Sequence, residues 1–162
     1  MITIRRYQPG DSIAVKSLIT DIMKGEFGEA QAAYPTEDIE NIDVTYGGIG
    51  EAFFVAVDGS KIVGTVGIKK EDDRVALLRR LFVATAYRNR QIGLKLIDGA
   101  LHFCHEVGYQ EVVFKTTSQM KRAVEICKKR GFAQRAKLQL HNVELLKFSL
   151  SIRDGVKSSK AS

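Results

Sequence analysis

The chain has 162 residues, of which 44% are hydrophobic and 27% are charged, a composition typical of one soluble globular domain and not of a disordered or fibrous protein. No apolar run reaches the ~20 residues that a membrane-spanning helix needs, and residues 1–6 lack the apolar stretch of a secretory signal, so we expect a cytoplasmic protein without a membrane partner. The 25 lysines and arginines exceed the 19 aspartates and glutamates, and the resulting charge of +6 favours an anionic partner without identifying it.

The cysteines and histidines give no sign of a disulfide framework or a metal site. Cys104 and Cys127 are too few for such a framework, and neither stands in a metal-ligand spacing. The histidines His102, His105 and His141 form no metal-binding pattern either. Because a closed metal site requires more ligands than these, we expect no metal cofactor.

The first part of the chain predicts a strand and two helices. Alternating apolar and polar residues favour a half-buried strand over residues 1–7. Asp11 or Ser12 can cap the helix that follows. The apolar residues of this helix are Ile13, Val15, Leu18, Ile19 and Ile22. A second helix is expected to begin at residues 35–38.

Three consecutive strands are predicted next. A glycine cluster ends the helical part, a tight Asp-Gly turn joins the first two strands, and an acidic turn precedes the third. The strands are expected at Ala52–Val57, Lys61–Ile68 and Val75–Ala84.

The remaining chain predicts helices alternating with strands. A helix over about residues 91–106 carries one buried stripe of apolar residues spaced three and four apart. A short buried strand at 112–114 precedes a further helix that ends at Gly131. Two last strands are expected near 132–138 and 142–149.

These elements, in the order β-α-α-β-β-β-α-β-α-β-β, predict an α/β fold for a single domain over residues 1–150. Its sheet is expected to be mixed and mostly antiparallel, with about seven strands flanked by about four helices. Residues 151–162 are polar and small, and we expect them to form a disordered tail.

The segment after the third strand has the features of a phosphate-binding loop. The short basic loop Arg88 to Leu94 leads into a predicted helix, whose N-terminus presents unpaired N–H groups and a partial positive charge. Gly93 lets the backbone approach a ligand closely, and Arg88 and Arg90 add guanidinium groups that suit phosphate oxygens. These features favour a site for a diphosphate. A solvated basic turn remains the alternative, because short motifs of this kind are common.

Longer stretches resemble a known family. The residues from Leu78 to Val83 and from Arg88 to Ile97 closely resemble the acetyl-CoA segment of GNAT N-acetyltransferases, in which a strand ending in an apolar triplet precedes Gln/Arg-x-x-Gly-x-Gly/Ala and a helix. The resemblance covers roughly residues 1–149. Further matches, in the family's order, are Gly108-Tyr109, the strand Glu111 to Lys115, and Ala123 to Phe132.

The resemblance implies a GNAT-like fold and a role for each matching residue. The backbone at the end of the third strand would pair with the pantetheine arm of acetyl-CoA like an added strand, and the loop would wrap the pyrophosphate. The helix that ends at Gly131 would flank the arm near the thioester. The implied cofactor-binding residues are Leu81, Phe82, Val83, Arg88, Asn89, Arg90, Gln91, Ile92, Gly93 and Leu94.

Two positions depart from the family's pattern. Gln91 replaces the usual first glycine, where its side chain can crowd the loop or bond a phosphate oxygen. Cys127 stands where the family usually has a tyrosine, often proposed as the acid that protonates the departing CoA thiolate. A thiol with an ordinary pKa of ~8.5 can donate that proton, which makes Cys127 a candidate catalytic acid. The alternative is a small buried hydrophobic residue, the commonest fate of a free cysteine.

No candidate base stands on the strand before the loop, where many family members carry a glutamate. The segments that can border the acceptor pocket contain carboxylates, and they also contain aromatic residues that can line it or simply pack. The candidates are Glu26, Glu29, Glu51, Tyr34 and Tyr46. Direct transfer needs only a neutral amine beside an aligned thioester, so a dedicated base is not compulsory.

The resemblance implies an acyltransferase that moves an acetyl group from acetyl-CoA to a primary amine of a small molecule or protein by direct transfer. A non-catalytic acyl-CoA-binding or regulatory module is the alternative, because both usual catalytic side chains are missing. A homodimer stays open, and the sequence does not reveal the acceptor. We expect no nucleic-acid partner, because no stacking aromatic residues interleave with the basic residues Lys121, Arg122, Lys128, Lys129 and Arg130.

Overall fold

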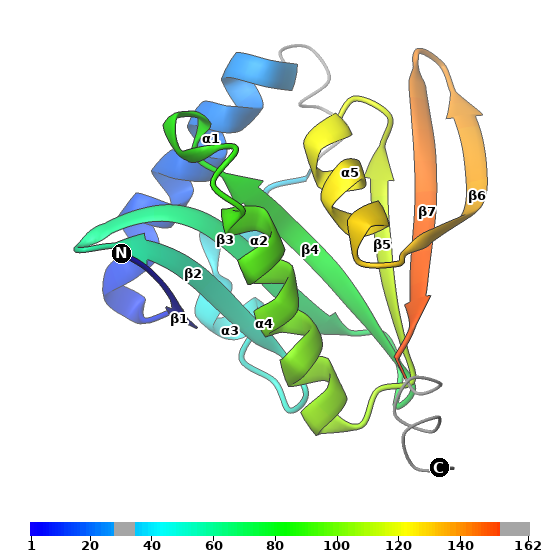
Figure 1. Cartoon of the computed structure of the whole chain (residues 1–162), viewed down its shortest axis with the longest axis horizontal. Coiled ribbons are helices and arrows are strands. Elements are labelled where there is room, and N and C mark those ends of the chain that lie inside the picture. The colour runs from blue at the N-terminus through cyan, green and yellow to red at the C-terminus, as the bar shows by residue number, and fades with distance from the viewer. Residues whose placement is uncertain (28–34, 153–162) are drawn as a thin grey trace.

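The computed structural model describes residues 1–27 and 35–152. Its strands form one seven-stranded sheet (Figure 1). The strand order is β1-β2-β3-β4-β5-β7-β6, and every neighbouring pair is antiparallel except β4–β5, which is parallel. This confirms the predicted mixed, mostly antiparallel sheet. The strands are β1 Ile2–Arg6, β2 Ala52–Asp58, β3 Lys61–Lys70, β4 Val75–Val83, β5 Glu111–Thr117, β6 Ala133–Leu140 and β7 Val143–Ser151.

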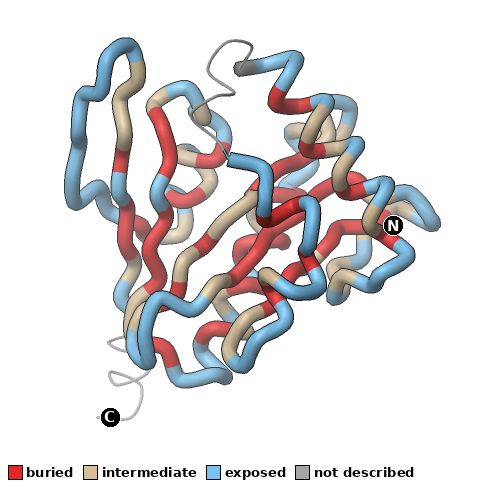
Figure 2. Tube along the Cα trace, turned by 180° about the vertical axis from the view of Figure 1, so that it is seen from behind, coloured by how far each residue is buried: buried red, intermediate tan, exposed pale blue. Residues whose placement is uncertain are grey.

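Helices cover both faces of this sheet. Helices α4 and α5 lie on one face, and α1 to α3 lie on the other face, over β2, β3 and the end of β4 (Figure 1). Each layer of helices encloses its own apolar core. The β6–β7 hairpin stands at one side of the molecule, away from α1 to α3 (Figures 1 and 2). The helices are α1 Ser12–Phe27, α2 Glu37–Glu40, α3 Ile42–Thr45, α4 Ile92–Val107 and α5 Lys121–Lys129, with 3₁₀ turns η1 Pro9–Asp11 and η3 Thr85–Tyr87.

Helix α4 follows the stripe read from the sequence. Its apolar residues at spacings of three and four are buried against the sheet, as an amphipathic helix requires. Gly108 ends it in the left-handed conformation, with φ of +103°, and donates its N–H to the carbonyl of Cys104 at 3.1 Å. The buried residues are Ile92, Gly93, Leu96, Ile97, Ala100 and Cys104.

The region predicted as one second helix contains two short ones. Asn41 separates α2 from α3 with φ of −139° and ψ of +61°, values outside the helical region. Ile39 and Ile42 both stay buried, so the apolar side is kept while the helix breaks. Asp11 also differs from expectation. It accepts the N–H of Gln8 at 2.8 Å and so stabilises η1.

The end of the described chain belongs to the sheet. Strand β7 runs to Ser151, which lies opposite Glu111, and Ile152 donates its N–H to Gln110 at 3.0 Å. Strand β7 therefore extends past the strand end expected near residue 149, because backbone pairing continues where the composition turns polar. The rest of the predicted tail, residues 153–162, lies outside the described residues.

Candidate active site

A cleft opens where β4 leaves β5. The two strands pair in parallel only as far as Leu78, which lies opposite Phe114. Beyond this point β4 continues beside β3, with Phe82 opposite Thr65, and no longer pairs with β5. One edge of β4 therefore carries backbone groups without a strand partner, facing the gap between the two strands.

Arg80 bends β4 at the point of divergence. Its φ of +55° lies in the left-handed region, which costs a non-glycine residue about 1–2 kcal/mol. The register between β3 and β4 shifts beside it, and the Thr65 hydroxyl donates a hydrogen bond to its carbonyl at 2.7 Å. The side chain of Arg80 is 8% exposed and donates to both carboxylate oxygens of Asp38, at 2.9 and 2.6 Å. The strained backbone is thus anchored through its side chain to α2.

The Asp38 carboxylate gathers several donors. The Tyr46 hydroxyl donates to it at 2.7 Å, and Arg80 also donates to the carbonyl of Pro35. Burial raises the pKa of Asp38, but the hydrogen bonds from Arg80 and Tyr46 outweigh burial and bring the pKa below its usual value. Burial also raises the pKa of Tyr46. At neutral pH the network therefore holds an ionised carboxylate and a neutral phenol.

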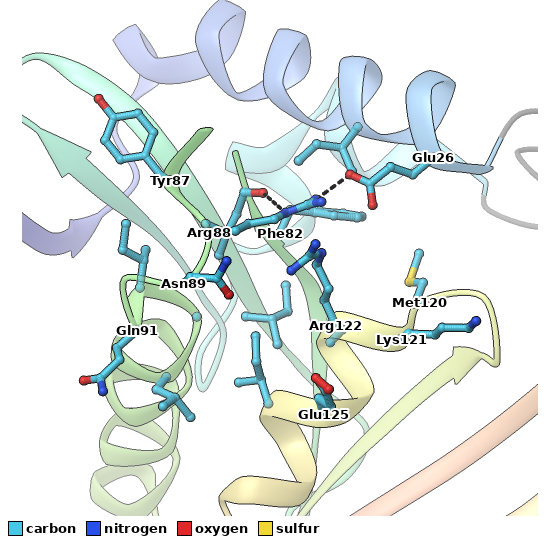
Figure 3. Close-up of a pocket in the computed structure, with 18 of the residues that line it drawn as sticks. Glu26, Phe82, Tyr87, Arg88, Asn89, Gln91, Met120, Lys121, Arg122 and Glu125 are labelled. Carbon is cyan, nitrogen blue, oxygen red and sulfur yellow. Dashed lines mark hydrogen bonds and ion pairs between the residues drawn. The ribbon is translucent and has the colours of Figure 1, made fainter. Parts of the chain in front are cut away.

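The gap between β4 and β5 is part of a cavity of about 520 Å³ (Figure 3). Its walls come from the end of α1, the end of β4, the loop before α4, and α5 with the turn before it. The cavity brings together every residue of the predicted cofactor site except Arg90. These are Leu81, Phe82, Val83, Arg88, Asn89, Gln91, Ile92, Gly93 and Leu94.

Left-handed residues shape the loop before α4. Asn89 and Gln91 have φ of +67° and +61°, and Gln91 is the N-cap of the helix. Glycine adopts this conformation without a Cβ clash, which gives a physical reason for the glycine that the resembling proteins usually carry at the position of Gln91. The loop here keeps that conformation with a side chain present.

Gly93 has a packing role. A Cβ at this position would lie 2.4 Å from the Cδ1 atom of Ile126 and 3.7 Å from a methyl group of Val83. The glycine therefore lets the first turn of α4 pack closely against α5. The approach of a ligand to its backbone stays a prediction.

The two arginines of the loop lie differently. Arg88 donates from Nε to the carbonyl of Val83 at 3.1 Å and forms an ion pair of 2.5 Å with Glu26 of α1, so it spans the cleft (Figure 3). The Arg90 guanidinium stacks over the ring of Tyr87, with its carbon 4.9 Å from the ring centroid. Phosphate binding by Arg88 would require it to exchange these partners for the ligand.

Comparison with known proteins identifies the family. The model of the Acetyltransferase (GNAT) family matches residues 17–132, which include the β4 edge, the loop, α4 and α5. The chain belongs to this family.

Three similar proteins illustrate the family relationship. "Probable N-acetyltransferase camello" of Xenopus tropicalis is 30% identical over 129 residues, which are 74% of this chain and 59% of that protein. This chain thus spans about six tenths of that relative. A GNAT acetyltransferase structure from Staphylococcus aureus Mu50 has a TM-score of 0.80 at 25% identity, covering 94% of this chain and 99% of that one. An acetyltransferase structure from Salmonella typhimurium with its cofactor acetyl-CoA has a TM-score of 0.76 at 15% identity, covering 93% and 94%.

Cys127, the candidate acid, is fully buried in the core under α5 and is not among the residues that line the cleft. Burial raises the pKa of its thiol to about 12. Its neighbour Ile126 does line the cleft, because successive helical residues point in directions about 100° apart. This GNAT-family domain therefore gives the thiol no direct contact with the cleft, and the geometry supports the packing role.

The candidate carboxylates and tyrosines separate clearly. Glu26 lines the cleft, whereas Glu51 is not among the lining residues. Glu51 accepts hydrogen bonds from the backbone and forms an ion pair of 3.0 Å with Lys69. Tyr46 is a core residue that contacts Asp38, as described above. Residues Glu29 and Tyr34 lie outside the described residues.

The resemblance placed helix α5 beside the pantetheine arm, but it did not name the side chains that α5 and the turn before it contribute to the cleft wall. The turn before α5 and one side of that helix contribute charged, polar and apolar side chains to this wall. The spacing of three and four along α5 was the available signal. These residues are Gln119, Met120, Lys121, Arg122, Ala123, Glu125, Ile126 and Lys129.

Two further features concern metals and membranes. In the described ranges 1–27 and 35–152, no three histidine, cysteine, aspartate or glutamate side chains gather as a metal-binding group. Over the same ranges, no helix is both long enough and apolar enough to cross a membrane.

Proposed function

We propose that this domain transfers the acetyl group of acetyl-CoA directly to a primary amine. The observation that carries the proposal is the single cavity that joins the unpaired edge of β4 to the N-terminus of α4. Such a cavity offers strand-like pairing to an amide-containing arm and a positive helix end to a diphosphate. The GNAT family match and the acetyl-CoA named with one structural relative support the same donor.

The donor would be held from both ends. The first hydrogen bond of α4 runs from the N–H of Lys95 to the carbonyl of Gln91, so the N–H groups before Lys95 have no partner inside the helix and can bind phosphate oxygens. Arg88, Arg122 and Lys129 line the same cavity and add positive charge. The pantetheine arm would then run back along β4 toward the point where β4 and β5 meet.

The chemical step needs few protein groups. The neutral amine attacks the thioester carbonyl carbon, the carbon–sulfur bond breaks, and the proton lost by nitrogen reaches the departing thiolate or water. Alignment of the two reactants supplies much of the acceleration. Backbone N–H groups on the free edge of β4 can polarise the carbonyl. Glu26 and Glu125 line the cleft and are the described carboxylates available to accept the proton through water.

Two measurements test this proposal. Calorimetry with acetyl-CoA should show binding at micromolar to millimolar ligand, and thiol release should increase when an amine panel is added. Absence of binding at millimolar acetyl-CoA would refute the donor assignment. Binding without turnover on any amine would instead favour a non-catalytic acyl-CoA-binding module, the second candidate, which the burial of Cys127 and the absence of a carboxylate on β4 favour.

A further inference from the structure

Two lysines lie side by side on the sheet face opposite α4 and α5. Phe114 of β5 and Phe148 of β7 are opposite each other and pack in the core under these helices. The next pair in the ladder is Lys115 and Lys147. Because successive residues of a strand point to opposite faces, both lysines point to the other face, with Cβ atoms ~5 Å apart. Both are exposed, and the hairpin that contains Lys147 lies away from α1 to α3 (Figure 2).

This pairing of like charges is unfavourable as it stands. Like charges directly opposite each other destabilise a sheet by up to ~1 kcal/mol. Among the described residues, neither Lys115 nor Lys147 forms an ion pair, whereas Lys137 on the adjoining strand pairs with Glu144 at 3.3 Å. A third cation, Arg79 of β4, is 39% exposed, and its guanidinium lies 3.9 Å from the Asp38 carboxylate. An anion bound on this face would relieve the repulsion.

A hollow lies beside the two lysines. Its volume is about 330 Å³, and Ala136, Leu138 and Leu145 line it together with Lys115 and Lys147. Leu138 is 58% exposed, so the hollow presents apolar surface beside the two ammonium groups. The hollow therefore suits a ligand with both carboxylate and apolar parts.

The hollow adjoins the cleft at the end of β5. Thr117 ends this strand and lines the hollow, and Gln119 lines the cleft two residues later, at most ~7 Å along the chain. Lys115 is the first residue of β5 beyond the last β4–β5 pair, where the two strands diverge. Crossing from β4 to β7 covers ~10 Å, about three residues of an extended peptide.

We propose that this face binds the acceptor, and that the acceptor is a peptide with carboxylate side chains within about three residues of its reacting amine. Lys115 and Lys147 recognise the carboxylates, Arg79 adds to the same field, and the apolar hollow holds an intervening side chain. The inference rests on the proposed acetyl transfer, because that reaction brings an amine to the end of the cleft.

The test compares matched peptides and matched variants. One peptide has a free N-terminal amine followed by aspartates, and the other has asparagines in their place. Thiol release from acetyl-CoA should give a kcat/KM about tenfold higher for the aspartate peptide, as two ion pairs of ~0.5–1 kcal/mol predict. In the double variant K115Q/K147Q, kcat/KM for the aspartate peptide should fall about tenfold relative to that for the asparagine peptide, so that the preference is lost. The control K128Q removes a single exposed charge from α5, on the other face, and should keep the preference.

Three results would overturn the proposed role of this face. Equal kcat/KM for both peptides in the wild type would overturn the inference. So would a K115Q/K147Q variant that prefers the aspartate peptide as strongly as the wild type does. A change in oligomeric state of the double variant, measured by light scattering, would assign the face to contact between copies and overturn it as well. If no amine releases thiol, the proposed function fails. Fluorescence anisotropy of the labelled peptides then tests the surface itself, and tighter binding of the aspartate peptide to wild type than to K115Q/K147Q is the expected result.

Discussion

The substitution Asp38→Asn tests whether the contact with Arg80 holds the bend in β4. The two side chains are 7% and 8% exposed, so the change leaves a guanidinium buried beside a neutral amide. Removing one partner of a buried ion pair costs about 3–5 kcal/mol. Because Arg80 keeps its hydrogen bond to the carbonyl of Pro35, we expect the lower end, about 3 kcal/mol. For a domain of this size that loss lowers Tm by about 6–12 °C.

Urea unfolding and calorimetry with acetyl-CoA measure the two consequences. The free energy of unfolding should fall as stated, and acetyl-CoA should bind about tenfold more weakly, equivalent to ~1.4 kcal/mol, because the free edge of β4 is displaced. Asp11→Asn is the control, since the Arg5–Asp11 pair is more exposed, at 34% and 11%, and lies outside the cleft lining. The control should cost about 1 kcal/mol and leave the affinity unchanged. A cost for Asp38→Asn no larger than for the control would refute the reasoning.

The difference in stability between wild type and Asp38→Asn should depend on pH in one direction. The pKa of Asp38 lies below its usual value, because hydrogen bonds from Arg80 and Tyr46 outweigh the effect of burial. A carboxylate of this kind stabilises the fold fully above its unfolded pKa of ~4, and the stabilisation is lost as pH falls through the folded pKa. The stability gap between wild type and Asp38→Asn should therefore be full at neutral pH and shrink below pH ~4. A gap that stays constant into acid would contradict this account.

Three further changes probe the cleft. Gln91→Gly should be about 1 kcal/mol more stable to urea than Gln91→Ala, since glycine alone adopts the φ of +61° without strain, and the reverse order would contradict that strain. Cys127→Ala should keep the pH–rate profile of acetyl transfer, because the thiol is buried, and loss of one limb of the profile would restore its role as an acid. Glu26→Gln should free Arg88 for the ligand and so tighten acetyl-CoA binding about threefold in calorimetry. This factor corresponds to the energy of one partly exposed ion pair. Weaker binding would mean that Glu26 orients Arg88 for the ligand.

Local patterns in the sequence carried most of the fold. The apolar stripe of α4 and the alternation along the strands are repeated signals in which many residues agree, so the element order and the mixed sheet were predicted correctly. The break at Asn41 was missed because a short helix with two buried isoleucines has the same apolar pattern whether or not it is continuous. Tertiary pairing also extends β7 to Ser151, where local composition signals a tail.

The site was only partly accessible to the same reasoning. The loop before α4 was readable because its residues are consecutive, whereas the contact between Arg80 and Asp38 joins residues 42 apart in the chain, and the Arg88–Glu26 pair also joins separate elements. Cys127 was a candidate by its position in a motif, but a motif does not state which side of a helix faces the cleft. That orientation depends on how α5 packs on the sheet.

The two positions where local preference fails most clearly both border the cleft. Among the four non-glycine residues with positive φ, asparagine and histidine adopt this region more readily than Arg80, where β4 diverges from β5, and Gln91, at the N-cap of α4. Such strain persists only where surrounding contacts determine the backbone. For Arg80 the determining contact is Asp38, which belongs to the helices on the opposite face from α4. The opening that would receive the pantetheine arm is therefore controlled from the side of the sheet by which the acceptor would arrive, so a change in α2 should alter acetyl-CoA binding without touching any residue of the loop.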